Sequence, residues 1–259
     1  VLPEGMGVRE TNTIGYQLET RRQLQPVLSH DQERLCQLEL DGKPRLVRGV
    51  AGSGKTAVLA NWIMQTLLRL VDKEDLRIWA VFANRSLQSL IARSIEDAWN
   101  NETNGQAFPW EKVKLVHIRE VLDPMLQRIG QSMDAFGYEY DKAAEMVLDR
   151  SGVDGIKPCC EALFVDEAQD LGPSALRLLT NLVNQSDPDN ANSRSVNIFY
   201  DNAQNIYDRK TPKWSDIGLD MRGRSTVMKE SFRSTKPISE FALNVLYQLS
   251  SMGESADHK

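Results

Sequence analysis

The chain is poor in cysteine, and none of its hydrophobic runs approaches the length that a membrane span requires. Its three cysteines, Cys36, Cys159 and Cys160, are too few and too badly spaced for a disulfide framework or a zinc site. The sequence also contains no signal-peptide pattern, internal repeat or low-complexity tract. From these absences we expect a protein of a reducing, cytoplasmic compartment with no membrane partner.

An excess of positive charge is also missing. Lys and Arg number 31 against 36 Asp and Glu, which gives a net charge of −5. Non-specific nucleic-acid binding depends on Lys and Arg facing phosphates, so this balance is mild evidence against a protein coated in nucleic acid. A local basic groove remains compatible with it, and charge alone leaves the partner undecided.

The composition is that of a globular protein. Hydrophobic residues make up 41% and charged residues 26% of the 259 positions. This length is enough for one large domain or for one and a half smaller ones. The chain begins at Val1 without a methionine, so we expect a fragment or a processed form.

Residues 49–56 (GVAGSGKT) match the phosphate-loop pattern G-x-x-x-x-G-K-S/T at every fixed position. Residues 44–50 form a short apolar stretch typical of a strand, and residues 57–71 are apolar with no Pro or Gly, which predicts a buried helix. In such a strand–loop–helix, glycines allow backbone N–H groups to surround a phosphate chain, and the helix N-terminus adds partial positive charge. The sequence therefore predicts a nucleoside triphosphate site.

Two side chains of this loop have individual roles. Lys55 is expected to reach the β- and γ-phosphates, and the Thr56 hydroxyl is expected to hold Mg²⁺. The predicted nucleotide-binding residues of the loop are Gly49, Ala51, Gly52, Ser53, Gly54, Lys55 and Thr56.

Strands and helices alternate along the chain. We expect further strands at residues 76–82, 113–117, 161–166, 196–201 and 226–229, and further helices at residues 28–42, 87–99, 174–183 and 237–249. Residues 118–155 look mostly helical, and we interpret them as an inserted helical element. This alternation predicts an α/β fold with a parallel sheet covered by helices on both faces, in which ligands bind beyond the carboxyl ends of the strands.

Two consecutive acids, Asp166 and Glu167, stand at the end of the strand at residues 161–166. Asp166 directly after an apolar strand can reach the Mg²⁺ held by Thr56. Glu167 is then placed to accept a proton from water, so we predict that it is the general base. Solvated acids at a strand end are the alternative, which the apolar strand and the matching phosphate loop disfavour.

Four segments together resemble the motifs of superfamily 1 helicases of the UvrD/Rep type. They are residues 49–56, residues 166–170 (DEAQD), residues 200–207 (YDNAQNIY) and residues 231–234 (SFRS). They occur in the family's order, and the closest similarity is to the bacterial group in which such a helicase follows a nuclease-related (NERD) domain. The resemblance implies a RecA-like fold and hydrolysis of Mg-ATP coupled to translocation on single-stranded DNA. It also implies a RecA-like domain at residues 28–221 and a junction with the start of a second RecA-like domain at residues 222–259. Residues 1–27 show no clear period, and we interpret them as a lead-in segment.

The resemblance also implies roles for individual residues. Gln32 resembles the glutamine that reads the adenine edge, although an ordinary surface helix residue is the alternative. Gln204 resembles the glutamine that senses the γ-phosphate and couples hydrolysis to DNA. Phe232 resembles the aromatic residue that stacks on the base, and Arg233 the arginine that contacts the γ-phosphate and stabilises transition-state charge.

Contacts to single-stranded DNA are implied at the same edge of the sheet. Asn84, Arg85 and His117 lie where the family touches the single-strand backbone. Tyr207 and Trp214 are candidate base-stacking residues, because stacking suits binding that is independent of sequence. Packing within the protein is the alternative for each of these residues.

The chain departs from the family's pattern in two places. Tyr200 stands where the family usually has a glycine before Asp201, and the chain ends at Lys259, soon after Arg233. The remaining motifs of the second RecA-like domain are therefore absent, and we expect that this chain alone does not unwind duplexes. Two other functions remain open: a nucleotide-dependent switch that acts on proteins, and a nucleic-acid-binding module with negligible hydrolysis.

Overall fold

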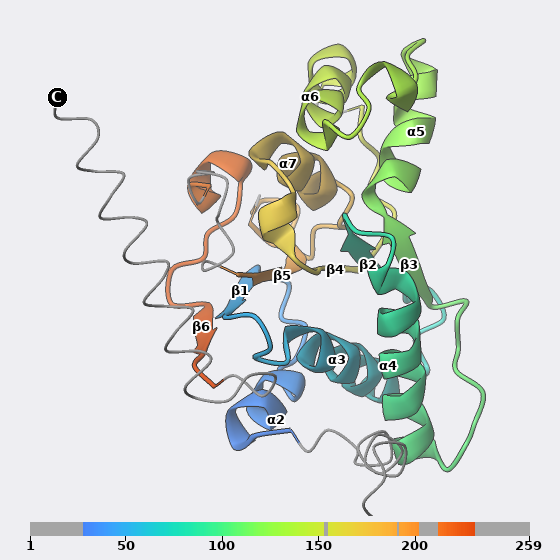
Figure 1. The fold of residues 1–259 in the computed structure, drawn as a ribbon, viewed down its shortest axis with the longest axis vertical. Coiled ribbons are helices and arrows are strands. Elements are labelled where there is room, and N and C mark those ends of the chain that lie inside the picture. The colour runs from blue at the N-terminus through green and yellow to red at the C-terminus, as the bar shows by residue number, and fades with distance from the viewer. Residues whose placement is uncertain (1–27, 153–154, 191, 202–211, 231–259) are drawn as a thin grey trace, which may run out of the picture.

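The computed structural model describes residues 28–152, 155–190, 192–201 and 212–230 (Figure 1). The strands are β1 (Arg45–Gly49), β2 (Ile78–Phe82), β3 (Val113–His117), β4 (Ala162–Val165), β5 (Ser195–Tyr200) and β6 (Ser225–Met228). The α-helices are α2 (His30–Cys36), α3 (Lys55–Arg69), α4 (Leu87–Thr103), α5 (Ile118–Arg128), α6 (Tyr140–Ser151) and α7 (Pro173–Asn181). Short 3₁₀ helices are η1 (Met133–Ala135), η2 (Ala168–Asp170) and η3 (Trp214–Ile217).

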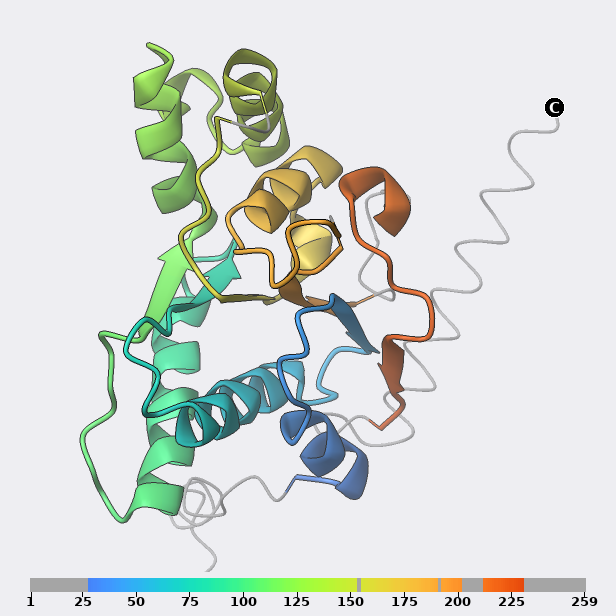
Figure 2. The ribbon, with the colours of Figure 1, turned by 180° about the vertical axis from the view of Figure 1, so that it is seen from behind.

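All six strands belong to one sheet with the order β3-β2-β4-β5-β1-β6, and every pairing in it is parallel. Strands β4 and β5 are buried along their whole length, as expected for a parallel sheet covered on both faces. Seen from behind, β6 lies at the outer edge of the sheet beside β1 (Figure 2). The expected α/β fold, a parallel sheet with helices on both faces, is confirmed.

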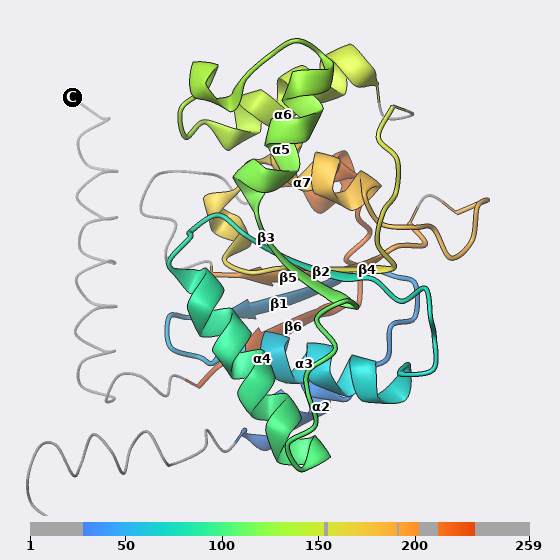
Figure 3. The same cartoon turned by 90° about the vertical axis from the view of Figure 1, so that its right-hand side faces the viewer.

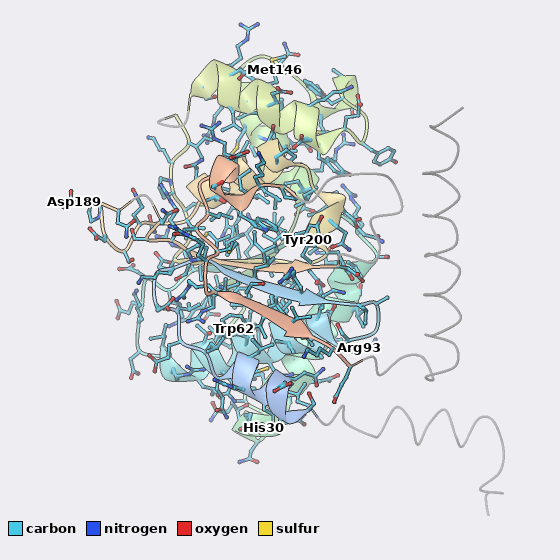
Figure 4. All side chains as sticks on the ribbon, turned by 90° about the vertical axis from the view of Figure 1, so that its left-hand side faces the viewer. His30, Trp62, Arg93, Met146, Asp189 and Tyr200 are labelled. Carbon is cyan, nitrogen blue, oxygen red and sulfur yellow. The ribbon has the colours of Figure 1, made fainter. Side chains whose placement is uncertain are left out.

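Each face of the sheet has its own helical layer. Helices α2, α3 and α4 cover one face, and α5, α6 and α7 lie over the other (Figure 3). Two apolar cores result, one on each side. Figure 4 shows Trp62 of α3 on one side of the sheet and Tyr200 of β5 toward the other.

The segment expected to be an inserted helical element does contain helices, α5, η1 and α6. This segment contributes buried side chains to the apolar core that also contains α7, among them Val121, Leu122 and Val147. In Figure 1 the two helices lie above α7, at the end of the molecule away from α3. The segment therefore extends the helical layer on one face of the sheet.

Helix α2 is shorter than expected. The sequence predicts that it ends at Gly42, but it ends at Cys36. The carbonyl groups that would continue the helix are used by α3: Arg69 donates to the carbonyls of Cys36 and Gln37 at 3.3 and 3.1 Å. Gly42 instead has a φ of 68° and forms part of the turn before β1.

The sheet includes residues beyond 221. Strand β6, which lies within the range expected for the junction, pairs with β1. A cluster of charges joins the beginnings of these two strands: Asp41 accepts from Arg45 at 2.8 Å and from Arg224 at 2.6 Å. Arg224 also donates to the carbonyl of Pro44 at 2.8 Å.

Some expected elements lie outside the described residues, namely the lead-in segment at residues 1–27 and the closing helix at residues 237–249. Within the described part of the chain, none of the helices is both long and apolar enough to cross a membrane.

Trp62 is the residue on which we expect stability to depend most. It is fully buried, its ring lies edge-on to Phe164 at 5.5 Å and to Phe199 at 6.4 Å, and its Nε1 donates to the Leu38 carbonyl at 2.7 Å. We predict that Trp62→Ala lowers the free energy of unfolding by about 3–5 kcal/mol, because it leaves a large cavity.

Urea unfolding followed by circular dichroism measures this loss. Trp110→Ala is the matched control, since Trp110 is 37% exposed, and it should cost less than about 1 kcal/mol. Equal losses in the two variants would show that the core does not depend on Trp62.

Candidate functional site

The loop between β1 and α3 has the backbone that phosphate binding requires. Gly52 and Gly54 have φ values of 78° and 84°, a left-handed conformation that favours glycine. The absence of a side chain at Gly49 allows the end of β1 to lie close to Ser53, because a Cβ at Gly49 would lie 2.4 Å from the Ser53 hydroxyl oxygen. Helix α3 begins at Lys55 with no side chain capping its N-terminus, so its first N–H groups remain available to an anion.

Lys55 lies between this loop and acids from two other strands. Its ammonium donates to the carbonyls of Gly49 and Val50 at 3.0 and 3.4 Å. It also pairs with Asp201 at 3.3 Å and lies 3.9 Å from Glu167. Both partners of the Asp201 pair are buried, with exposed side-chain fractions of 4% and 0%. The ends of β4 and β5 therefore face the phosphate loop.

Thr56 and Asp166, which the sequence predicts as magnesium ligands, are in contact. The Thr56 hydroxyl donates to Oδ2 of Asp166 at 3.0 Å. Burial raises the pKa of Asp166 from 3.8 to about 6, and the negative charge of Glu167 adds to this effect, while the Thr56 hydrogen bond opposes it. A buried carboxylate held against a hydroxyl in this way has the chemistry of a site for a hard divalent cation.

Glu167 has a strained backbone and a defined side-chain partner. Its φ of 46° places a non-glycine residue in the left-handed region, which is uncommon and costs energy. Gln169 donates to the Glu167 carboxylate at 2.6 Å and accepts from the Asp201 backbone N–H at 3.0 Å. A chain of contacts thus joins Glu167, Gln169, Asp201 and Lys55.

Sequence reasoning gave no role to Gln169 or Asp201. Gln169 lies inside the DEAQD segment, and Asp201 directly follows β5 at the same sheet edge as the other acids. Figure 4 shows the arrowheads of β1, β5 and β6 ending at this edge. A polar residue at the carboxyl end of a parallel strand was the signal that could have identified them.

The residues at this edge fit a polyphosphate with a divalent cation. The Ser53 hydroxyl is buried, and within the described part of the chain it has no hydrogen-bond partner. It shares the loop with the uncapped start of α3 and with Lys55. An orphaned hydroxyl, free N–H groups and a buried ammonium are a set of donors that an oxyanion would satisfy.

Gln32 touches the phosphate loop directly. It is buried, its Nε2 donates to the Ser53 carbonyl at 2.8 Å, and its Oε1 accepts from the Ser29 N–H at 2.8 Å. The second of these bonds belongs to the predicted capping box of α2, which is present.

A second group of predicted residues, Asn84, Arg85 and His117, is gathered around a hollow of about 560 Å³ at the ends of β2 and β3. Residues that sequence reasoning missed also line it: Ala83, Arg119, Tyr138, Tyr140 and Asp170. Tyr138 is 86% exposed, and the two tyrosine rings lie edge-to-face at 6.5 Å. The chain segment that carries them showed only a helical pattern, which gave no signal of this role.

His117 is used within the protein. Its Nδ1 accepts from the Arg119 N–H at 3.1 Å, which caps α5, and its Nε2 lies 2.8 Å from the Ala83 carbonyl. Burial lowers the pKa of His117. Both ring nitrogens therefore have partners within the protein. Through them His117 joins Ala83 and the start of α5, which both border the hollow.

Trp214 is not brought together with the other predicted nucleic-acid residues. Its ring packs edge-on against Tyr200 at 5.8 Å, and it lines a different cavity, of about 840 Å³, together with Arg48 and Arg222. Four further predicted site residues lie outside the described residues: Gln204, Tyr207, Phe232 and Arg233.

Two solved structures similar to this chain are Pif1 helicases. The Pif1 helicase from Candida albicans is 17% identical with a TM-score of 0.42, and the alignment covers 81% of this chain and 41% of that one. A structure of two coordinating Pif1 helicases at forked double-stranded DNA gives 15% identity, a TM-score of 0.38, and coverage of 82% and 46%. This chain thus spans less than half the length of either, and at these values the likeness has no bearing on function. No protein-family model matches the chain, and no curated protein matches it in sequence.

The raised pKa of Asp166 predicts how stability depends on pH. The folded-state pKa is about 6 against an ordinary 3.8, so between these pH values the folded protein binds more protons than the unfolded one. The stability of the wild type therefore falls as pH rises through this window. Asp166→Asn removes the effect, so at pH 7 the variant should be more stable by up to about 3 kcal/mol.

Urea unfolding with a chelator of divalent cations, carried out at a series of pH values, measures this difference. The two proteins should converge toward pH 4. A variant less stable than the wild type at pH 7 would contradict the assigned burial of an ionised Asp166.

Proposed function

We propose that this chain is the ATP-binding and hydrolysing domain of a superfamily 1 DNA helicase, of the UvrD/Rep type that its motifs resemble and of the NERD-associated bacterial group. The observation that carries the proposal is the meeting of Lys55, Thr56 and Asp166 at one sheet edge. An ATPase needs a phosphate cradle, a metal ligand and a base in one place. We place the protein in the cytoplasm.

In this proposal the phosphate loop and Lys55 bind the phosphate chain, and Thr56 with Asp166 holds Mg²⁺. The bound ion would neutralise phosphate charge as it develops. Glu167 accepts a proton from the attacking water, and Gln169 positions the Glu167 carboxylate through the 2.6 Å hydrogen bond. We assign the γ-phosphate contacts of Gln204 and Arg233, and the base contact of Phe232, on the resemblance alone.

We further propose that the hollow beside β2 and β3 binds single-stranded DNA. An exposed tyrosine ring and an exposed arginine are the two kinds of contact that sequence-independent binding uses, the ring for bases and the cation for phosphates. In the described part of the chain, Tyr138 and Arg85 supply them, and both line this hollow. Tyr207 is a further candidate on the resemblance alone, whereas the packing of Trp214 against Tyr200 favours a structural role for that residue.

Translocation needs a second RecA-like domain, so unwinding by this chain alone is not part of the proposal. Because β6 pairs with β1, we place the boundary of the first domain beyond Met228. The rate of ATP hydrolysis with and without single-stranded DNA distinguishes this function from a switch that acts on proteins. DNA should raise the rate for a helicase domain and leave it unchanged for such a switch.

The nucleotide site is tested at Lys55. Replacing it with alanine removes the cation of the loop, so Lys55→Ala should abolish binding of Mg-ATP. Calorimetric titration measures the affinity, and Lys73→Ala, a change at an exposed lysine, should bind as the wild type does. Equal affinity in the wild type and in Lys55→Ala would refute the nucleotide site.

The nucleic-acid site is tested at the hollow beside β2 and β3. Tyr138→Ala should weaken binding of a single-stranded oligonucleotide by about 1–3 kcal/mol without changing its salt dependence, because it removes stacking. Arg85→Ala should weaken binding of the oligonucleotide and, in addition, reduce the salt dependence of that binding, because it removes a phosphate contact.

Fluorescence anisotropy at several salt concentrations measures both effects. Arg150→Ala, at an exposed position on α6, is the matched control. If all three variants bind as the wild type does, the oligonucleotide does not use this hollow.

A further inference from the structure

We propose that Asp141 of α6 is a positioning residue for the general base Glu167, and that it acts by capping α7 from outside that helix. Residues 167–172 form the turn that leads from β4 into α7, so the start of α7 fixes one end of this turn. The inference deepens the proposed function and rests on it. Sequence reasoning gave Asp141 no role, because the segment around it showed only a helical pattern.

Helix α7 takes its N-terminal cap from another helix. Its N-cap residue is Gly172, and no side chain at that position makes a capping hydrogen bond. Oδ1 of Asp141 instead accepts from the backbone N–H of Ala175, the third residue of α7, at 2.9 Å. An N-cap side chain normally makes this bond, and a negative charge at a helix N-terminus also suits the helix dipole. Asp141 therefore supplies from α6 the cap that Gly172 lacks.

The carboxyl group of Asp141 occupies the space beside Gly172. A Cβ on Gly172 would lie 2.1 Å from Cγ and 2.5 Å from Oδ2 of Asp141. The backbone of Gly172 is ordinary extended chain, with φ of −85° and ψ of 172°, which any residue adopts. The absence of a side chain at this position therefore serves to admit the carboxyl group and does not serve the backbone conformation.

Asp141 stands on a helix that is itself firmly packed. Helix α6 lies beside α7 (Figure 1). Ala143 and Ala144 of α6 are fully buried, and so is Ala175 of α7, all in the same apolar core. Because the core fixes α6, the carboxyl group of Asp141 has a fixed place from which to hold the start of α7.

The turn at residues 167–172 is strained and has to be held at both ends. Glu167 has a φ of 46°, and such a conformation persists only where the surrounding structure imposes it. At one end, the Asp166 N–H donates to the Val81 carbonyl at 2.9 Å, directly after the buried strand β4. At the other end is the cap from Asp141. Without that cap one end of the turn is released, and the Glu167 carboxylate loses its place beside the attacking water.

The groups that bind the nucleotide lie on other segments, so rate and affinity should respond differently. Lys55 and Thr56 stand at the start of α3, and Asp166 precedes the turn. Asp141→Ala should lower kcat of ATP hydrolysis by about five- to tenfold, the population shift that loss of a helix cap causes, with affinity for Mg-ATP unchanged. Asp141→Asn keeps an accepting oxygen and is an equally good cap, so it should retain the kcat of the wild type.

Gly172→Ala tests the same contact from the other side. In the wild type the added methyl group would displace the carboxyl group of Asp141, so kcat should fall by a similar factor. In the Asp141→Ala background the space is free, and the same methyl group should cause no further loss. Losses that add in the double variant would contradict the cap. Gly172→Ala alone carries the prediction if Asp141→Ala does not fold.

Steady-state hydrolysis at saturating Mg-ATP measures kcat, and calorimetric titration with a non-hydrolysable ATP analogue measures affinity. Ser132→Ala is the matched control. It removes a side-chain cap from η1, which belongs to the same helical layer, and it should leave both quantities unchanged.

The outcomes separate the positioning role from the proposed function. Unchanged kcat in Asp141→Ala, or an equal fall of kcat in Ser132→Ala, would overturn the positioning role and leave the proposed function standing. A fall in affinity that matches the fall in kcat would show a general loss of structure and would overturn it too. A wild type that hydrolyses no ATP would overturn the proposed function, and the positioning role with it.

Discussion

The hydrogen bond between Thr56 and Asp166 is the contact on which the rest of the site depends. It joins residues that are 110 positions apart, across the end of β5, which lies between β1 and β4 in the sheet. Parallel pairing in a fixed register is what brings these strand ends to one edge, and burial of both sheet faces fixes that register. The helices and their two apolar cores thus serve to place a hydroxyl from one segment against a carboxylate from another.

At the same edge, acidic side chains outnumber basic ones. Lys55 faces Asp201 and Glu167, and Asp166 lies beside them with a pKa raised by burial. A polyphosphate would bring further negative charge, which a divalent cation at Thr56 and Asp166 would neutralise. The contacts of Lys55 with the Gly49 and Val50 carbonyls and with Asp201 would exchange for contacts to phosphate. Ligand binding and the ion pair of Asp201 are therefore linked through one ammonium group.

Much of this arrangement could be predicted from sequence because it is encoded locally. The phosphate loop follows a strand and precedes a helix, and apolar runs located β2 to β6 to within about two residues. The early end of α2 could not be predicted, because the carbonyls at its end bind Arg69 of α3, a partner distant in sequence. Tyr138 was missed for a similar reason. Its surroundings come from segments far away in the chain, and hydrophobic periodicity reports only which face of an element is buried. Gln169 and Asp201 differ, because they follow the carboxyl ends of β4 and β5, a sequence signal that was available but not used.

The most direct test of a shared magnesium site is a double-mutant cycle on Mg-ATP affinity with Thr56→Val and Asp166→Asn. If both side chains hold one ion, each single variant loses that ion, and the double variant should lose little more than either single variant alone. Losses that add in the double variant would show that the two residues act independently. That result would contradict a single Mg-polyphosphate site at this edge of the sheet.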